Sequence, residues 1–288
     1  MMHWNDGISN PLVFESLLFL ISISAGVFGS IVGMGGGIII VPALTLIFGV
    51  SMQHAVGASL VAAIATSSGA AATYVRDHMT NVRLALFLEV ATTLGALLGV
   101  FLSPWIPTSG LFFAFSLILL FSAGMMMKPR KSEALSPTLS HPWAKTLKLD
   151  SSYPEKNERI HYGVAHVPLA FFLMIAAGIL SALLGIGSGT LKVPAMDSAM
   201  KLPMKVSSAT SNFMIGVTAA ASAGAYYMKG NILPILAAPV ALGVLCGATL
   251  GTKIMIHLPS QSIRKLFVVI LLLISIQMGL KSFGIQLQ

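Results

Sequence analysis

The stretch Gly33-Met-Gly-Gly-Gly-Ile-Ile-Ile-Val-Pro42 interrupts apolar sequence with three consecutive glycines and a proline. It returns 152 residues later as Gly185-Ile-Gly-Ser-Gly-Thr-Leu-Lys-Val-Pro194. The same offset pairs further residues without a gap: Gly26 with Gly178, Ser59 with Ser211, Tyr74 with Tyr226, Gly95 with Gly247, Gly99 with Gly251, and Pro107 with Pro259. Two copies of a membrane segment, each broken by Gly and Pro at the same place, are typical of secondary transporters.

The composition indicates a membrane protein. The chain has 288 residues, of which 56% are hydrophobic and 9% charged, and its mean hydropathy is +0.87. Its apolar runs of roughly 20 residues are long enough to cross about 30 Å of hydrocarbon. The net charge of +8 lies mostly in loops between these runs, which favours membrane orientation over nucleic-acid binding. We expect no nucleic acid, cofactor or metal, because Cys246 is the single cysteine and the histidines show no metal-ligand spacing.

The pattern predicts an all-α integral membrane protein with a first repeat over 1–127, a linker over 128–166 and a second repeat over 167–288. The expected apolar segments are 12–33, 37–49, 53–75, 82–103, 109–127, 167–186, 189–200, 206–228, 232–252 and 266–282. Two of them, 37–49 and 189–200, are too short to span, so we expect about eight full spans plus two short half-helices. The polar, proline-containing linker is expected to be a poorly ordered loop. The first apolar run lacks the basic flank of a signal peptide and is expected to belong to the mature fold.

The topology depends on whether the two short segments cross the membrane. If they cross, each copy has five crossings and the second copy is inverted; if they do not, the copies are parallel. No Lys or Arg precedes Arg76, so the N-terminus is expected outside and the linker in the cytoplasm. Five crossings then place 14 of the 17 basic residues on the cytoplasmic side, and four crossings place 11 there. The positive-inside rule therefore favours inverted repeats in the inner (plasma) membrane.

The two glycine–proline motifs, with the stretch Lys205-Val-Ser-Ser-Ala-Thr-Ser-Asn-Phe-Met-Ile-Gly-Val-Thr218, resemble the sulfite exporter TauE/SafE family. The resemblance covers both repeats and leaves out the linker. It implies a polytopic inner-membrane carrier of small sulfur-containing anions such as sulfite or organosulfonates. One departure from the doubled motif is Ser188, which stands where the first copy has Gly36.

An anion site is also expected from the residues themselves. A helix that begins inside the membrane presents backbone N–H groups and partial positive charge at its N-terminus, and glycines let an anion approach closely. The residues expected to flank the substrate are Gly35, Gly36, Gly37, Gly187, Ser188, Gly189 and Thr190. Pro42 and Pro194 are expected to kink the half-helices. Close helix packing is the alternative explanation for the glycines.

Hydroxyl and amide donors near the breaks could bind an oxyanion that must later be released. Ser59 and Ser211, which the repeat relates, are the preferred candidates, together with Asn212. The alternative is that such side chains bond to carbonyls of their own helices. Tyr74 and Tyr226 are expected at the membrane interfaces as aromatic anchors.

Two charged residues fall inside predicted spans. Lys192 lies three residues after Gly189 and could offset the charge of a bound anion; the alternatives are that it reaches the interface or pairs with Asp197. Glu89 could carry a proton coupled to anion movement, or could be a neutral carboxyl that joins helices.

The favoured mechanism is alternating access around a fixed anion site. The alternatives are an uncoupled anion channel with the same site, or a membrane protein of sulfur metabolism without transport activity. The sequence contains no nucleophile–base arrangement, so we do not expect an enzyme. It leaves open the anion, the direction, the coupling ion and the oligomeric state.

Overall fold

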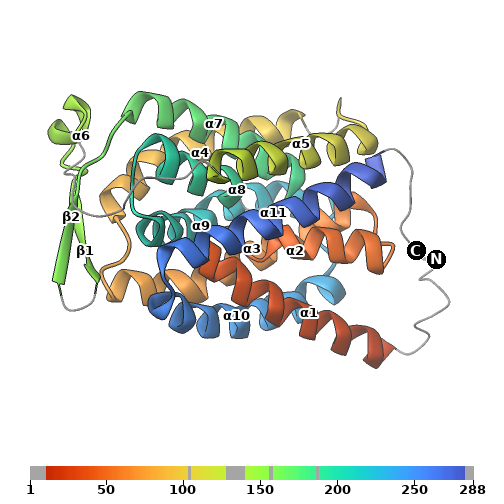
Figure 1. The fold of residues 1–288 in the computed structure, drawn as a ribbon. Coiled ribbons are helices and arrows are strands. Elements are labelled where there is room, and N and C mark those ends of the chain that lie inside the picture. Colours follow the sequence, from red (N-terminus) through yellow and green to blue (C-terminus); the bar gives the residue numbers. More distant parts are fainter. Residues whose placement is uncertain (1–10, 103–104, 128–139, 156–157, 186–187, 283–288) are drawn as a thin grey trace.

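A computed structural model describes residues 11–102, 105–127, 140–155, 158–185 and 188–282. The long helices are α1 (Pro11–Val32), α3 (Met52–Arg76), α4 (Val82–Leu102), α5 (Thr108–Met127), α7 (Val167–Leu184), α9 (Met204–Met228), α10 (Pro234–His257) and α11 (Ser260–Ser282). The short elements are the helices α2 (Gly37–Pro42), α6 (Pro142–Thr146) and α8 (Gly189–Pro194), the π-helical turns η1 (Ala43–Ile47) and η3 (Ala195–Ala199), and the strands β1 (Ser151–Glu155) and β2 (Glu158–Tyr162). The helices form one elongated bundle, and the strands lie at one end of it (Figure 1).

Seven of the described helices are long and apolar enough to cross a membrane: α1, α3, α4, α5, α7, α10 and α11. The chain is therefore a multi-pass membrane protein. Helix α9 is as long as α3, at 25 residues, but is not among the seven. Its polar side chains, including Ser207, Ser211 and Asn212, are buried against other helices rather than exposed to lipid.

Part of the central linker is ordered, so the prediction of a poorly ordered loop is wrong for residues 140–155 and 158–166. Strands β1 and β2 pair antiparallel, and Asn81 from the α3–α4 loop donates hydrogen bonds to Leu149 O (2.7 Å) and Tyr162 Oη (3.2 Å). Burial raises the pKa of Tyr162 to about 12, so its phenol remains neutral. Lys205 on α9 forms an ion pair with Glu155 at 3.4 Å. These contacts fasten the hairpin to the end of the bundle.

Each short helix returns to the end of the bundle from which the preceding long helix came. The rings of Phe14 at the start of α1 and Phe48 after η1 are 4.9 Å apart. In the second half, Ala165 N donates to Met200 O at 3.0 Å, which joins the start of α7 to the end of η3. Segments α2–η1 and α8–η3 are therefore re-entrant.

The prolines of the motif mark a change of helix type. Pro42 and Pro194 end the α-helical turns, and the π-helical turns begin at the next residue. A proline has no N–H to donate to the preceding turn, which loosens the α-helical ladder at that point. The predicted kinks thus take the form of α-to-π junctions.

Small residues allow helices from the two halves to pack closely. A Cβ added at Gly95 on α4 would overlap Ile175 O on α7, and one added at Gly247 on α10 would overlap Ile23 O on α1. Gly95 and Gly247 are 152 positions apart, and so are Ile23 and Ile175, so the two contacts correspond to each other in the repeat. Close backbone approach through glycine is how membrane helices gain packing energy without a hydrophobic driving force.

Helices α3 and α9 lie side by side and run antiparallel. Gly57, near the start of α3, approaches Asn231 O just past the end of α9, and Asn81 N donates to Thr210 Oγ1 near the start of α9 at 3.1 Å.

The prediction that Tyr74 and Tyr226 are interface anchors is wrong. Both are buried, and their hydroxyls donate to Ser30 O and Ala182 O, each at 3.0 Å, where they hold α3 to α1 and α9 to α7.

The glycine packing yields a stability prediction. Gly247→Ala should destabilise the protein by about 1–3 kcal/mol, because the added methyl group meets backbone that cannot yield easily. Gly124→Ala on α5 is the matched control: nothing lies within 4 Å of its Cβ position, so the change should be neutral or stabilising by up to about 1 kcal/mol. Thermal unfolding in detergent measures both, and equal stability of the two variants would contradict the packing argument.

Candidate functional site: a buried ion pair beside two helix breaks

The two helix breaks meet inside the bundle. A Cβ on Gly37 would lie 2.6 Å from Gly185 O, and a Cβ on Gly189 would overlap Gly33 O. Gly33 and Gly185 have positive φ angles of +77° and +69°, which end α1 and α7 and turn the chain back. The breaks of both halves therefore pack against each other, with backbone facing backbone.

Hydroxyl groups from the opposite half hold each break. Ser59 Oγ on α3 donates to Gly185 O at 2.5 Å, and Ser211 Oγ on α9 donates to Gly33 O at 2.6 Å. These carbonyls lie where regular helical hydrogen bonding stops, so each needs a partner at membrane depth. In this conformation both serines bond to backbone carbonyls of the opposite half, and not only to carbonyls of their own helices as the alternative to substrate binding expected.

The other predicted residues near the breaks are also engaged or enclosed. Gly36 N donates to Thr66 Oγ1 at 3.2 Å, and Asn212 Nδ2 donates to Ser30 O at 2.7 Å. Gly35 has a φ of +72° and faces Ile215. Thr190 and Ser188 are both buried. Ser188 has a positive φ of +59°, whereas its counterpart Gly36 has a negative φ. Gly187 lies outside the described residues.

A charged cluster lies next to the breaks. Lys192 on α8 is fully buried, and its Nζ donates to Glu89 Oε2 on α4 at 3.2 Å and to Thr218 Oγ1 on α9 at 2.7 Å. Thr218 Oγ1 in turn donates to Glu89 Oε1 at 2.5 Å, and Thr93 Oγ1 reaches the same oxygen at 3.3 Å. Elements from both halves of the chain thus build one polar centre, which we call the Lys192 centre (Lys192, Glu89, Thr218).

The structure excludes both alternatives for Lys192. It does not reach an interface, because its side chain has 0% exposure. It does not pair with Asp197 either: both Asp197 carboxylate oxygens accept from Arg264 Nη2, at 2.7 and 3.0 Å. Asp197 is therefore a structural partner of α11, and the two charges expected inside spans, Lys192 and Glu89, pair with each other.

Thr218 is one of the hydroxyl-bearing residues that the sequence places opposite the breaks, but Thr92, whose Oγ1 lies 3.4 Å from that of Thr218, was not predicted. One signal was available. Opposite charges within membrane spans usually pair, and Glu89 and Lys192 are such charges. Their contacts with α9 then depend on tertiary packing, since Glu89 and Thr218 are 129 positions apart.

The residues 152 positions away from the three members of the Lys192 centre carry no charge. Ile40, Ala241 and Thr66 correspond to Lys192, Glu89 and Thr218. Ile40 is fully buried in an apolar cluster with Leu44 and Val244. The two halves share the helix breaks, but among the described residues the ion pair lies beside the second break only.

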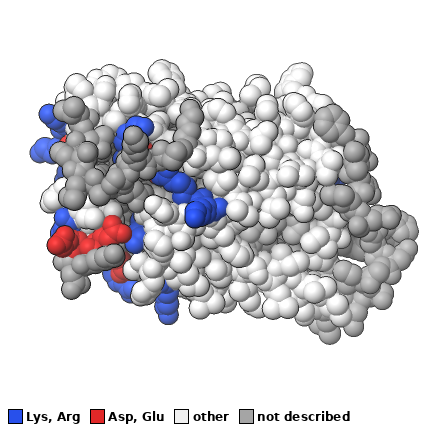
Figure 2. All heavy atoms as spheres, viewed as in Figure 1, with Lys and Arg blue, Asp and Glu red and all other residues white. Residues whose placement is uncertain are grey.

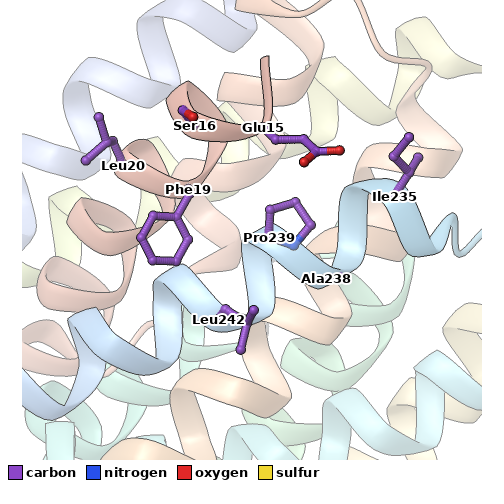
Figure 3. Close-up of a pocket in the computed structure, with 8 residues that line it drawn as sticks. All are labelled: Glu15, Ser16, Phe19, Leu20, Ile235, Ala238, Pro239 and Leu242. Atoms are coloured by element: carbon purple, nitrogen blue, oxygen red, sulfur yellow. The ribbon is translucent and has the colours of Figure 1, made fainter. Parts of the chain in front are cut away.

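Two grooves on the described surface do not reach this centre. One groove lies between α1 and α10 and is lined by Glu15, Phe19, Pro239 and their neighbours (Figure 3). Another, apolar, lies against η1 and α11. Neither shares a lining residue with the Lys192 centre, which is closed in this conformation.

Broken, re-entrant helices around a buried charge are features of polytopic membrane transport proteins. The comparison with protein families agrees. The family described as "Sulfite exporter TauE/SafE" matches residues 18–278, and the chain belongs to this family of membrane transport proteins.

Two relatives from Bacillus subtilis (strain 168) support the assignment. The chain is 27% identical to "Probable membrane transporter protein YunE" over 272 residues, which cover 91% of this chain and 96% of the relative. It is 25% identical to "Probable membrane transporter protein YdhB" over 244 residues, covering 82% and 89%. No solved structure matches the chain.

The ion pair leads to a second stability prediction. Lys192→Met should destabilise the protein by about 3–5 kcal/mol, because it leaves Glu89 buried without its partner. The double variant Lys192→Met/Glu89→Gln should recover most of that loss, since no unpaired charge remains. Thermal unfolding in detergent measures this cycle. A double variant that loses the sum of the single losses would show that the two residues act independently.

Proposed function

We propose that the protein is a secondary transporter that moves a small sulfur-containing anion, of the sulfite, organosulfonate or thiosulfate class, across the inner membrane by alternating access. The observation that carries the proposal is the fully buried Lys192 on a re-entrant helix whose break packs against the break of the other half. Membership of the sulfite exporter TauE/SafE family supports the substrate class.

The chemistry of the Lys192 centre suits an anion. An ammonium group inside the bilayer is costly and usually faces a pathway for polar solutes. Thr218 and Thr92 add hydroxyls that can donate to an oxyanion. A lysine presents a compact charge without the bidentate geometry of arginine, which favours a ligand that must be released. The closed centre favours a carrier over an open pore.

An inverted arrangement of the two halves supports the alternating-access part of the proposal. Helices α3 and α9 correspond by the 152-residue offset and run antiparallel. Each re-entrant segment returns the chain to the end of the bundle at which the preceding long helix began. The helices that follow in each half, α3 to α5 and α9 to α11, then cross an odd number of times. Rocking of inverted halves around a central site would expose it alternately to each side.

We assign the hairpin end to the cytoplasm and the start of α1 to the outside. Figure 2 shows most visible Lys and Arg side chains at the end of the molecule that carries the hairpin in Figure 1. Basic residues favour the cytoplasmic side. This places Lys201, Lys205 and Arg264 inside, and Ser51, just before α3, outside.

Cysteine labelling tests this topology. In a Cys246→Ser background, Ser51→Cys and Lys201→Cys should react with an impermeant maleimide from opposite sides of the membrane, since both positions are exposed and lie at opposite ends. Labelling of both from the same side would overturn the inverted arrangement.

Transport itself is tested in proteoliposomes. Labelled sulfite should enter saturably, and thiosulfate or sulfoacetate should compete better than chloride. Lys192→Met should reduce uptake roughly 10- to 100-fold, the loss expected when a charge-assisted hydrogen bond to the substrate is removed. Ile40→Met is the matched control at the corresponding position of the first half and should retain uptake.

Equal loss in both variants would indicate disturbed packing rather than a charge at the site. Absence of uptake of every sulfur anion by folded, correctly inserted wild-type protein would overturn the proposed substrate class.

A further inference from the structure

The Lys192 centre is electrically balanced before any substrate arrives. Lys192 Nζ contacts Glu89 Oε2 at 3.2 Å, and both side chains are at least nine-tenths buried. Among the described residues, the polar side chains bonded to Glu89 are Lys192 from α8, Thr218 from α9, and Thr93 from its own helix. Helix α7, which packs along α4, presents Phe171, Ile175 and Gly178. Among the described residues, Lys192 is thus the one charged group that faces the Glu89 carboxylate.

A substrate anion at Lys192 would upset this balance. It would take the position of the carboxylate on the ammonium and leave two negative charges beside one positive charge. Like charges at this spacing in a low-dielectric site are strongly unfavourable. The conflict disappears if Glu89 holds a proton while the anion is bound.

We propose that the substrate anion and the Glu89 carboxylate compete for Lys192, so that the anion binds only when Glu89 has taken up a proton. This inference rests on the proposed function and names its coupling: one proton accompanies each anion through the centre. The proton comes from the solvent on the side of entry, resides on a Glu89 carboxyl oxygen while the anion contacts Lys192 Nζ, and leaves to the other side. No bond other than that O–H bond forms or breaks.

Thr218 is placed to follow the exchange. Its hydroxyl now accepts from Lys192 Nζ at 2.7 Å and donates to Glu89 Oε1 at 2.5 Å. Once Glu89 is protonated, the carboxyl O–H can donate to Thr218 Oγ1 instead. The threonine hydrogen is then free for the anion. We regard Thr218 as a positioning residue that converts the protonation of Glu89 into an additional donor for the substrate.

The rest of the fold offers no second copy of this device among the described residues. The residues 152 positions from Lys192, Glu89 and Thr218 are Ile40, Ala241 and Thr66, none of which is charged. The coupling ratio is therefore set by a single carboxylate.

The test uses the purified full-length chain with thiosulfate and sulfoacetate, whose charges do not change between about pH 5.5 and 8. Anion affinity is measured by ligand-induced thermal stabilisation, and transport by uptake and by homoexchange in proteoliposomes. For the wild type, affinity should rise about tenfold for each unit fall in pH over the range where one proton is taken up on binding. An inward proton gradient should accelerate uptake.

Glu89→Gln is the diagnostic variant. Lys192 then lacks a counter-ion, so anion binding should become tighter and independent of pH, and the anion should stabilise this variant more than the wild type. Homoexchange should persist, but the proton gradient should no longer accelerate uptake. Glu89→Asp, which keeps a carboxylate, should retain the pH dependence, and Glu15→Gln in the groove of α1 and α10 is the control for an unrelated carboxylate.

The outcomes separate the two proposals. If Glu89→Gln takes up the anion at the wild-type rate and with the wild-type pH dependence, the proposed proton coupling is wrong, but the proposed anion transport is not affected. If Glu89→Gln does not fold, the wild type decides: uptake of one proton from weakly buffered solution for each anion bound would support the coupling. Anion binding without proton uptake would overturn it. Absence of binding and transport of both anions in the wild type would overturn the proposed function itself.

Discussion

A broken helix within a membrane must find partners for its free backbone groups, and this requirement organises the structure. No water is available in the hydrocarbon region, so the partners must come from protein. Here each half supplies them to the other: Ser211 donates to Gly33 O, and Ser59 donates to Gly185 O. Glycine on both sides lets the two breaks approach to backbone contact. The breaks are therefore stable only when both halves are assembled.

That assembly also places the charges. Lys192 lies on α8, directly after the second break, and the helices α4 and α9 that support it bring Glu89 and Thr218 within hydrogen-bond distance. The pair would be expensive as separate charges in a bilayer, and it is tolerable because each charge neutralises the other. The corresponding position at Ile40 is apolar. In the part of the chain that the structure describes, the fold thus combines two similar helix breaks with a charged centre beside the second of them.

The repeated motif predicted the framework well. The expected short segments 37–49 and 189–200 correspond to α2–η1 and α8–η3, and the family resemblance is confirmed over residues 18–278. These features follow from local signals, namely glycine, proline and the length of apolar runs.

The ordered hairpin was not predicted, because its stability comes from contacts such as Asn81 with Tyr162, which are 81 positions apart. The buried roles of Tyr74 and Tyr226 were missed for the same reason, since a hydroxyl bonded to a distant carbonyl leaves no local pattern. For the site, the sequence identified Lys192 and Glu89 singly. Their pairing depends on how α4 packs beside the second break, which spacing along the chain does not reveal.

The central claim is that a substrate anion occupies Lys192 in place of Glu89. The most direct measurement is a crystal structure of the wild-type protein soaked with selenite, an analogue of sulfite whose selenium can be located by anomalous scattering. We expect an anomalous peak within hydrogen-bond distance of Lys192 Nζ, with the Glu89 carboxyl group moved away from the ammonium. A peak elsewhere in the bundle, with the 3.2 Å contact between Lys192 and Glu89 intact, would contradict it.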